Sequence, residues 1–168
     1  MWAGRFVTAV REGQWEYVRR SRGIRAVVIL AETDAGEVLL VEQMRVPIGG
    51  PCLELPAGLI GDGDDPDDSV EAAAARELIE ETGYRPGAVE RLGDYFSSPG
   101  MVSEGFTLVR ATGLERVGEG GGCDGEEIIV HRVPRADIAG FVAAKRAEGV
   151  GIDVKMLILL GAGSGQEC

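Results

Sequence analysis

The sequence predicts one α/β domain, an α/β/α sandwich with helices on both sides of a mixed central sheet. Strand-prone segments both precede and follow one strongly helical segment, and more helix is expected near the end of the chain. This order is typical of a sheet covered by helices. The chain has 168 residues, which suffice for one well-buried core and are too few for two independent ones.

The first element is a predicted β-hairpin. Residues 6–10 and 15–19 are rich in β-prone side chains, and the segment 11–14 between them suits a turn. Two strands alone are marginally stable in water, so the hairpin must pack on the main domain or on a second subunit. We therefore divide the chain into 1–22, a hairpin expected to support a homodimer, and 23–168, the main domain.

Two apolar runs predict adjacent strands of a buried sheet. Residues 24–31 and 37–43 are nearly continuous in apolar and β-branched side chains, with a turn signal between them. Glu54 alternates with apolar neighbours, as in a short strand, and Pro56 and Gly58 are expected to end it.

The central helix is predicted over 69–82. Alanine, leucine and glutamate are strong helix formers, and Gly83 suits the C-terminal end of a helix. The preceding segment, 58–68, is rich in glycine and aspartate and must be a loop. It delivers the chain to Asp68 or Ser69 as the N-cap.

The second half of the chain continues with strands and helices. Pro134 suits the first position of a helix. In order, we expect strands at 89–96 and 106–111, a flexible glycine-rich loop at 118–125, a strand at 128–132, and helices at 134–145 and 153–160.

The composition excludes several classes of function. Seventeen basic and 28 acidic residues give a net charge of −11, which argues against a nucleic-acid partner. A phosphate ligand would need a metal ion or local arginines.

Cys52, Cys123 and Cys168 are odd in number and lack C-x-x-C spacing, so neither a disulfide framework nor a zinc site is indicated. The sequence shows neither a signal-peptide pattern nor a long apolar run, so we expect a cytoplasmic protein without membrane contact.

Three glutamates on the central helix indicate a cation site. At about 100° per residue, Glu77, Glu80 and Glu81 fall within about a third of the circumference. The expected packing face is small and apolar: Ala72, Ala75, Leu78 and Ile79. Carboxylates are hard oxygen ligands, so Mg²⁺ or Mn²⁺ would offset their repulsion. The alternative is a solvated acidic face in which Arg76 pairs with Glu80.

The segment Arg76-Glu-Leu-Ile-Glu-Glu-Thr-Gly-Tyr84 resembles the second half of the Nudix hydrolase box, G-x5-E-x7-R-E-U-x-E-E-x-G-U. The resemblance spans nearly the whole chain and is closest to the ADP-ribose pyrophosphatase branch, whose sequence before the box is similar to residues 49–60. It implies a Nudix-type sandwich that uses Mg²⁺, with Mn²⁺ as a substitute, to hydrolyse ADP-ribose to AMP and ribose 5-phosphate. The alternatives are another nucleoside diphosphate sugar, such as GDP-mannose or a UDP-sugar, or a regulatory domain that binds ADP-ribose without cleaving it.

The same resemblance implies the metal ligands. Glu77 and Glu81 would be the principal ligands, Glu80 a third ligand or a support, and Ala57 a ligand through its backbone carbonyl. Arg76 would orient the carboxylates.

It also implies a base and phosphate contacts. Glu126, with Glu127 or Asp124 as the alternative, would act as general base on a mobile loop that closes on the substrate. Arg45 would bind phosphate through its guanidinium fork. Glu54 would border the metal and phosphate site; the alternative is an edge-strand residue that faces solvent.

Two further residues bear on substrate identity. Pro99 stands sixteen residues after Gly83, a spacing that resembles a mark of ADP-ribose hydrolysis within the family, although any turn proline would look the same. Trp15 matches an aromatic that stacks on adenine in related dimers, where the N-terminal sheet crosses to the partner; simple packing is the alternative. His131, alone in a strand, is interpreted as structural.

The first half of the box departs from the family pattern. Counting from Gly58 puts Asp64 where the family has a glutamate, whereas counting back from Arg76 puts Asp68 there and Asp62 at the glycine. The loop is thus about four residues longer than usual, and its role is left open.

Overall fold

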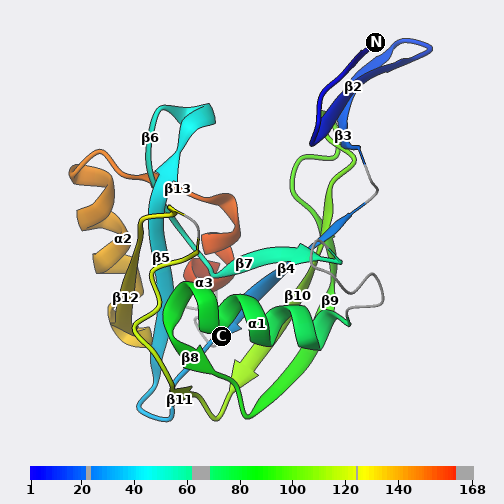
Figure 1. Ribbon diagram of the computed structural model, residues 1–168. Helices are drawn as coiled ribbons and strands as arrows, with labels where there is room; N and C mark the ends of the chain where they lie inside the picture. The colour runs from blue at the N-terminus through cyan, green and yellow to red at the C-terminus, as the bar shows by residue number, and fades with distance from the viewer. Residues whose placement is uncertain (22–23, 62–68, 124, 162–168) are drawn as a thin grey trace, which may run out of the picture.

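The chain folds as the predicted α/β/α sandwich. The computed structural model describes residues 1–21, 24–61, 69–123 and 125–161. Helix α1 (Val70–Thr82) packs on one side of the strands, and α2 (Ile138–Ala147) and α3 (Leu157–Gly161) pack on the other (Figure 1).

The strands between these helices form two four-stranded mixed sheets. One has the order β7-β4-β10-β9 and consists of β7 (Ala57–Ile60), β4 (Arg25–Ala31), β10 (Gly105–Thr112) and β9 (Ala88–Phe96). In the other, of order β12-β5-β6-β13, the strands are β12 (Ile128–Pro134), β5 (Glu37–Arg45), β6 (Gly50–Glu54) and β13 (Gly151–Ile152). The pairs β4 with β10 and β6 with β13 are parallel, and the others are antiparallel.

Strand β4 explains why the core has two halves. Its successive side chains point to opposite faces, so Val27 and Ile29 pack with α1 while Val28 and Leu30 pack with α2 and α3. A strand buried on both faces needs apolar residues at every position. This is why residues 24–31 form a continuous apolar run rather than an alternating one.

The N-terminal hairpin is present and gains a third strand. Strands β1 (Trp2–Ala3), β2 (Val7–Glu12) and β3 (Trp15–Arg20) form an antiparallel sheet that projects from the body (Figure 1). The turn between β2 and β3 begins at Gly13, whose φ of 60° favours glycine. At Val18 the hairpin meets the segment after β9, with backbone hydrogen bonds to Met101 and Ser103 of 2.9 and 3.0 Å.

The short strand expected around Glu54 is present as β6, which ends before Pro56. The loop expected from residue 58 is wrong at its start, because Gly58 lies inside a further strand, β7. Between β6 and β7 the chain crosses from one sheet to the other at Pro56, whose carbonyl accepts a hydrogen bond of 2.8 Å from the Ile29 amide. A proline interrupts a ladder because it has no N–H to donate.

The C-terminal helices also begin later than expected. Pro134 is the last residue of β12, and a 3₁₀ turn, η2 (Arg135–Asp137), precedes α2. A second 3₁₀ turn, η3 (Val154–Met156), takes the first part of the expected last helix. Further short elements that the sequence did not reveal are η1 (Val46–Ile48) and the pair β8 (Tyr84–Arg85) with β11 (Glu115–Arg116).

Membrane-spanning helices and cysteines can be described for these residue ranges only. None of the helices in these ranges is long and apolar enough to cross a membrane. Within them Cys52 is buried and Cys123 is exposed, and Cys168 lies outside the described residues.

Candidate active site

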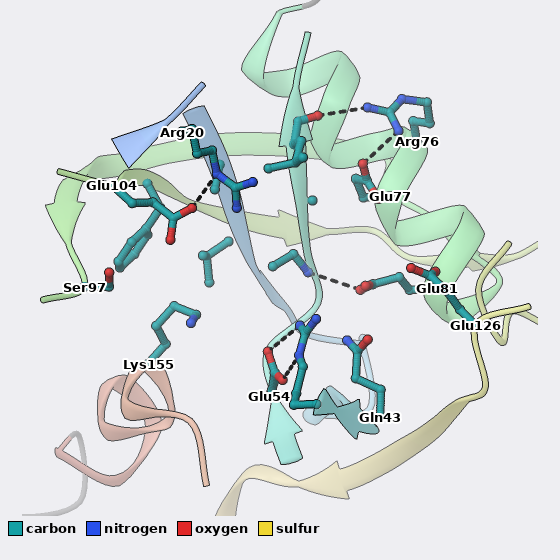
Figure 2. Close-up of a pocket in the computed structure, with 17 residues that line it drawn as sticks. Arg20, Gln43, Glu54, Arg76, Glu77, Glu81, Ser97, Glu104, Glu126 and Lys155 are labelled. Atoms are coloured by element: carbon teal, nitrogen blue, oxygen red, sulfur yellow. Dashed lines mark hydrogen bonds and ion pairs between the residues drawn. The ribbon is translucent and has the colours of Figure 1, made fainter. Parts of the chain in front are cut away.

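A cavity of about 510 Å³ opens between the two sheets, beside α1 (Figure 2). Seven of the residues singled out in the sequence line it: Arg45, Glu54, Ala57, Arg76, Glu77, Glu81 and Glu126. They come from five separate segments, namely the end of β5, the end of β6, the start of β7, α1, and the loop before β12. The fold therefore assembles in one place side chains that are up to 81 positions apart, between Arg45 and Glu126.

Helix α1 is capped as its sequence predicts. The Ser69 hydroxyl accepts a hydrogen bond of 3.1 Å from the Ala72 amide, so Ser69 rather than Asp68 is the N-cap. Asp62, Asp64 and Asp68 lie outside the described residues. Gly83 ends the helix in the left-handed conformation, with φ of 77°.

The packing face predicted for α1 is partly wrong. Ala72 is exposed, and the side chains buried on this helix are Val70, Ala73, Ala74, Leu78, Glu81 and Thr82. The buried arc is therefore rotated toward Glu81, because the helix contacts β5 and β12 of the second sheet as well as β4, β7 and β9 of the first. As a result one of the three glutamates is removed from bulk water.

Glu81 is the most buried of the helix glutamates. It is 7% exposed, and its Oε2 accepts a hydrogen bond of 3.1 Å from the Ala57 amide. Burial raises the pKa of Glu81 to about 8; the Ala57 hydrogen bond opposes this rise, and the nearby carboxylates of Glu77 and Glu126 add to it. Three carboxylates that repel one another at a partly dehydrated place are electrostatically unfavourable unless a cation joins them.

Glu77 lies directly on the backbone of β7. A Cβ added to Gly58 would fall 1.9 Å from the Glu77 carboxyl carbon, so only glycine leaves room for this side chain. Burial raises the pKa of Glu77, and the guanidinium of Arg76 partly offsets the rise. Arg76 bridges the helix and β7, since it donates to Glu77 over 2.7 Å and to the Leu59 carbonyl over 3.1 Å.

Glu80 does not line the cavity. Its carboxylate lies 3.7 Å from the Arg76 guanidinium, the i, i+4 pair expected for a solvated face. Within the described ranges, no three histidine, cysteine, aspartate or glutamate side chains are already placed to hold a metal ion. The donors nevertheless fit a hard divalent cation, because the buried carboxylate of Glu81 and the half-buried one of Glu77, with Glu126 nearby, are oxygen ligands in need of positive charge.

The glycine-rich loop is attached to the end of α1. The amides of Gly121 and Gly122 donate to the carbonyls of Glu81 and Glu80 over 2.9 and 3.0 Å, and the Gly118 amide donates to Gly83 over 3.1 Å. Such bonds satisfy carbonyls that a helix end leaves without partners. Contrary to the expected mobile loop, this glycine segment is fixed to the helix.

This attachment brings Glu126 to the cavity. Gly122 packs against the Glu126 side chain so closely that a Cβ on Gly122 would lie 2.8 Å from the Cβ of Glu126. Glu127 is exposed and does not line the cavity, and Asp124 lies outside the described residues.

Arg45 and Glu54 form a bidentate ion pair. Nε and Nη2 of Arg45 lie 2.5 and 2.8 Å from the two carboxylate oxygens of Glu54. The Glu54 hydrogen bond raises the pKa of Arg45. Glu54 is only 4% exposed, which excludes the alternative of a solvent-facing edge residue. Its two oxygens are engaged by Arg45, whose fork is thereby held at the cavity wall.

Trp15 and Pro99 lie apart from this cavity. Together with Tyr17 they line a separate pocket of about 450 Å³ at the junction of the hairpin and the segment after β9. Trp15 is 65% exposed. His131 is also outside the cavity, where its Nε2 lies 2.9 Å from Glu42, consistent with a structural role.

The cavity also contains residues that sequence reasoning missed. They are Arg20, Gln43, Ser97, Glu104, Phe106 and Lys155, together with small or apolar wall residues near β4 and β7. No local motif marks them, since the pair Arg20 and Glu104 is separated by 84 positions and meets only in the folded chain.

Comparisons with known proteins agree with this geometry. The family model described as NUDIX domain matches residues 22–152. The chain is 36% identical over 147 residues to the GDP-mannose pyrophosphatase of Cronobacter sakazakii, a match that covers 83% of this chain and 72% of that protein.

Other relatives carry a different substrate in their names. The ADP-ribose pyrophosphatase of Saccharomyces cerevisiae is 38% identical over 108 residues, which cover 59% of this chain and 45% of that protein. The crystal structure of a protein named ADP compounds hydrolase superposes with a TM-score of 0.67 and 24% identity, over 95% of this chain and 94% of that one. This last likeness supports the fold alone.

Proposed function

The chain belongs to the Nudix hydrolase family, and from this premise we propose that it hydrolyses the diphosphate bond of a nucleoside diphosphate sugar, with ADP-ribose as the first candidate. The products would be AMP and ribose 5-phosphate. The observation that carries the proposal is the group of Glu77, Glu81 and Glu126 facing a cavity whose wall also presents the Arg45 guanidinium.

Nudix hydrolases typically use a divalent metal ion. Here Glu77, Glu81 and the Ala57 carbonyl would hold Mg²⁺, or Mn²⁺ as a substitute, with Glu80 as an additional ligand or support. When bound, such an ion neutralises charge on the diphosphate and makes a coordinated water easier to deprotonate.

The protein's own groups supply the remaining steps. Glu126 would orient and deprotonate the attacking water, which must lie in line with the leaving oxygen. Arg45 would bind a phosphate oxygen with the N–H groups that Glu54 leaves free. Arg76 would keep the Glu77 carboxylate oriented from its bridge to β7.

The choice of ADP-ribose is supported by the pocket that contains both Pro99 and Trp15. An exposed indole offers a flat surface for an adenine ring. GDP-mannose is the second candidate, because the relative named for it aligns with 83% of the chain.

The hairpin would join two copies into a homodimer, and its exposed apolar side chains Trp2, Phe6 and Trp15 support that assembly.

A hydrolysis panel tests the proposal. The purified protein is incubated with ADP-ribose, GDP-mannose, a UDP-sugar and ADP-glucose, each with Mg²⁺ or with excess chelator, and the products are identified by mass. The reaction is run in ¹⁸O-labelled water, so that the label identifies the phosphorus that is attacked. We expect Mg²⁺-dependent release of AMP from ADP-ribose. Binding of ADP-ribose without any product would instead favour a regulatory domain.

A further inference from the structure

A second group of polar side chains lies in the cavity opposite the glutamates of α1. It consists of Arg20, Ser97, Glu104 and Lys155, with the ring of Phe106 in the same wall, and we call it the far end. Figure 2 shows Arg20, Ser97, Glu104 and Lys155 on one side and Glu77, Glu81 and Glu126 on the other, with Glu54 below and between them.

The charges of the far end cancel in pairs. Nε of Arg20 lies 2.6 Å from a carboxylate oxygen of Glu104, and Nζ of Lys155 lies 2.7 Å from a carboxylate oxygen of Asp153. Two cations and two carboxylates leave no net positive charge that would attract a further phosphate. Arg45 is likewise paired, with Glu54, but the glutamates of α1 lie in the same cavity and could hold a metal ion whose charge attracts phosphate.

The paired groups still offer unused hydrogen-bonding capacity. A guanidinium has five N–H donors and an ammonium has three, while a carboxylate can accept about four hydrogen bonds. The contacts between Arg20 and Glu104 and between Lys155 and Asp153 use only part of this capacity. A ligand that both donates and accepts at closely spaced positions matches such a surface, and the hydroxyl groups of a sugar do so.

Phe106 makes a sugar a better match than a nucleobase. The ring is only 8% exposed, stacks on its cross-strand neighbour Tyr95 with 5.8 Å between the ring centroids, and has the Lys155 ammonium 6.0 Å from its centroid. It can therefore contact the C–H groups of a small saturated ring, but its exposed area is too small for a base to stack on it. The exposed aromatic Trp15 lies in the other pocket.

We propose that the far end is a sugar-binding subsite in which Glu104 and Lys155 bind hydroxyl groups of a sugar ring attached to the diphosphate. Arg20 is a positioning residue that holds the Glu104 carboxylate. The inference rests on the proposed function, because the position of the diphosphate is set by the glutamates and Arg45. The substrate has two sugars with the same hydroxyl chemistry, the nucleoside ribose and the sugar beyond the diphosphate, and the test distinguishes them.

The test compares three substrates in each enzyme. They are ADP-ribose, its analogue with a 2′,3′-dideoxy adenosine ribose, and the methyl ester of ADP, which lacks the sugar beyond the diphosphate. kcat and KM are measured for the wild type, Glu104→Gln and Lys155→Met. For each enzyme, kcat/KM on ADP-ribose is divided by kcat/KM on each analogue. Partial loss of folded protein cancels in these ratios, because both substrates meet the same preparation.

We expect one of the two ratios to fall by about tenfold in Glu104→Gln and in Lys155→Met, mainly through KM. The analogue whose ratio changes identifies the sugar that is bound. Glu90→Gln is the matched control, since Glu90 forms an exposed pair with Arg110 and should leave both ratios unchanged. Ratios equal to those of the wild type in both far-end variants would refute the subsite while leaving the hydrolase function standing. A wild-type enzyme that cleaves none of the three would instead contradict the proposed function.

Discussion

Glu81 and Ala57 join helix α1 to strand β7. The carboxylate of Glu81 accepts a hydrogen bond of 3.1 Å from the Ala57 amide, across 24 positions of sequence. The bond fixes a buried carboxylate next to the backbone unit that would supply a further oxygen ligand. The geometry of the site thus depends on how closely α1 approaches β7.

Gly58→Ala tests that approach. The added Cβ would lie 1.9 Å from the Glu77 carboxyl carbon, so Glu77 must move even though the backbone at residue 58 tolerates alanine. A displacement of about 1 Å at a catalytic group can cost about 100-fold in activity, and we expect a loss of that size in kcat. The loss is measured by steady-state kinetics at several Mg²⁺ concentrations.

Gly140→Ala is the control for this substitution. Gly140 lies in α2, and a methyl group added there would meet nothing within 4 Å, so alanine should raise the free energy of unfolding by about 0.5–1 kcal/mol and leave kcat unchanged. Full activity in Gly58→Ala would show that the position of Glu77 is not critical.

Gly120→Ala tests the attachment of the glycine segment to α1. Gly120 has φ of 71°, and a Cβ there would lie 2.4 Å from the Thr82 carbonyl carbon, so the segment would have to leave the helix end. We expect a loss of about 3 kcal/mol or more in the free energy of unfolding, together with a lower kcat because Glu126 is displaced. Chemical denaturation and kinetics measure the two effects.

Gly125→Ala separates steric from conformational effects. Gly125 also has a left-handed φ, of 90°, but has open space around it, so only the backbone strain of about 1–2 kcal/mol should appear. Equal losses in Gly120→Ala and Gly125→Ala would contradict a specific contact with α1.

Glu42 gives a prediction about pH. Burial alone would raise the pKa of Glu42, but hydrogen bonds from Lys145 and His131, together with their charges, lower it below its ordinary value. A lowered folded pKa contributes stability that is present above the unfolded pKa of about 4.3 and is lost as the pH falls through the folded pKa. Glu42→Gln should therefore lower the free energy of unfolding by about 1–3 kcal/mol at pH 7.

The difference between wild type and Glu42→Gln should shrink below about pH 4.3. Urea unfolding at pH 7, 5 and 3.5 measures it. Glu148→Gln serves as the control, because Glu148 also pairs with Lys145 but is 58% exposed and should change the stability by less than about 1 kcal/mol. A difference that is constant over this pH range would contradict the assignment to Glu42.

Local signals explain what the sequence predicted well. The bounds of α1 follow from an N-cap serine, a run of helix formers and a terminal glycine, all within one segment. Its glutamate spacing places Glu77 and Glu81 correctly at the cavity. The same periodicity could not tell which alanines are buried, because that depends on which strands of the two sheets contact the helix.

Long-range assembly explains what the sequence missed. The far end joins Arg20 from the hairpin to Glu104 near β10 and to Lys155 near the C-terminal helix, and each of these residues is unremarkable in its own segment. Strand β7, in a segment predicted as loop, was missed for a related reason. Strands β6 and β7 each pair with a different sheet, and that choice is made by strands remote in sequence.

Glu81→Gln tests most directly the proposal that the α1 carboxylates at the cavity drive metal-dependent cleavage of a diphosphate. Glutamine keeps an oxygen for the Ala57 hydrogen bond but removes the negative charge. Glu71→Gln is the matched control, because Glu71 lies on the same helix, outside the cavity, paired with Arg91. The decisive measurement is the Mg²⁺-dependent turnover of ADP-ribose by the wild type and both variants, with folding checked by circular dichroism. We expect Glu81→Gln to remain folded and lose about two orders of magnitude or more in kcat, while Glu71→Gln stays near the wild type. Near-wild-type turnover in folded Glu81→Gln would contradict the account.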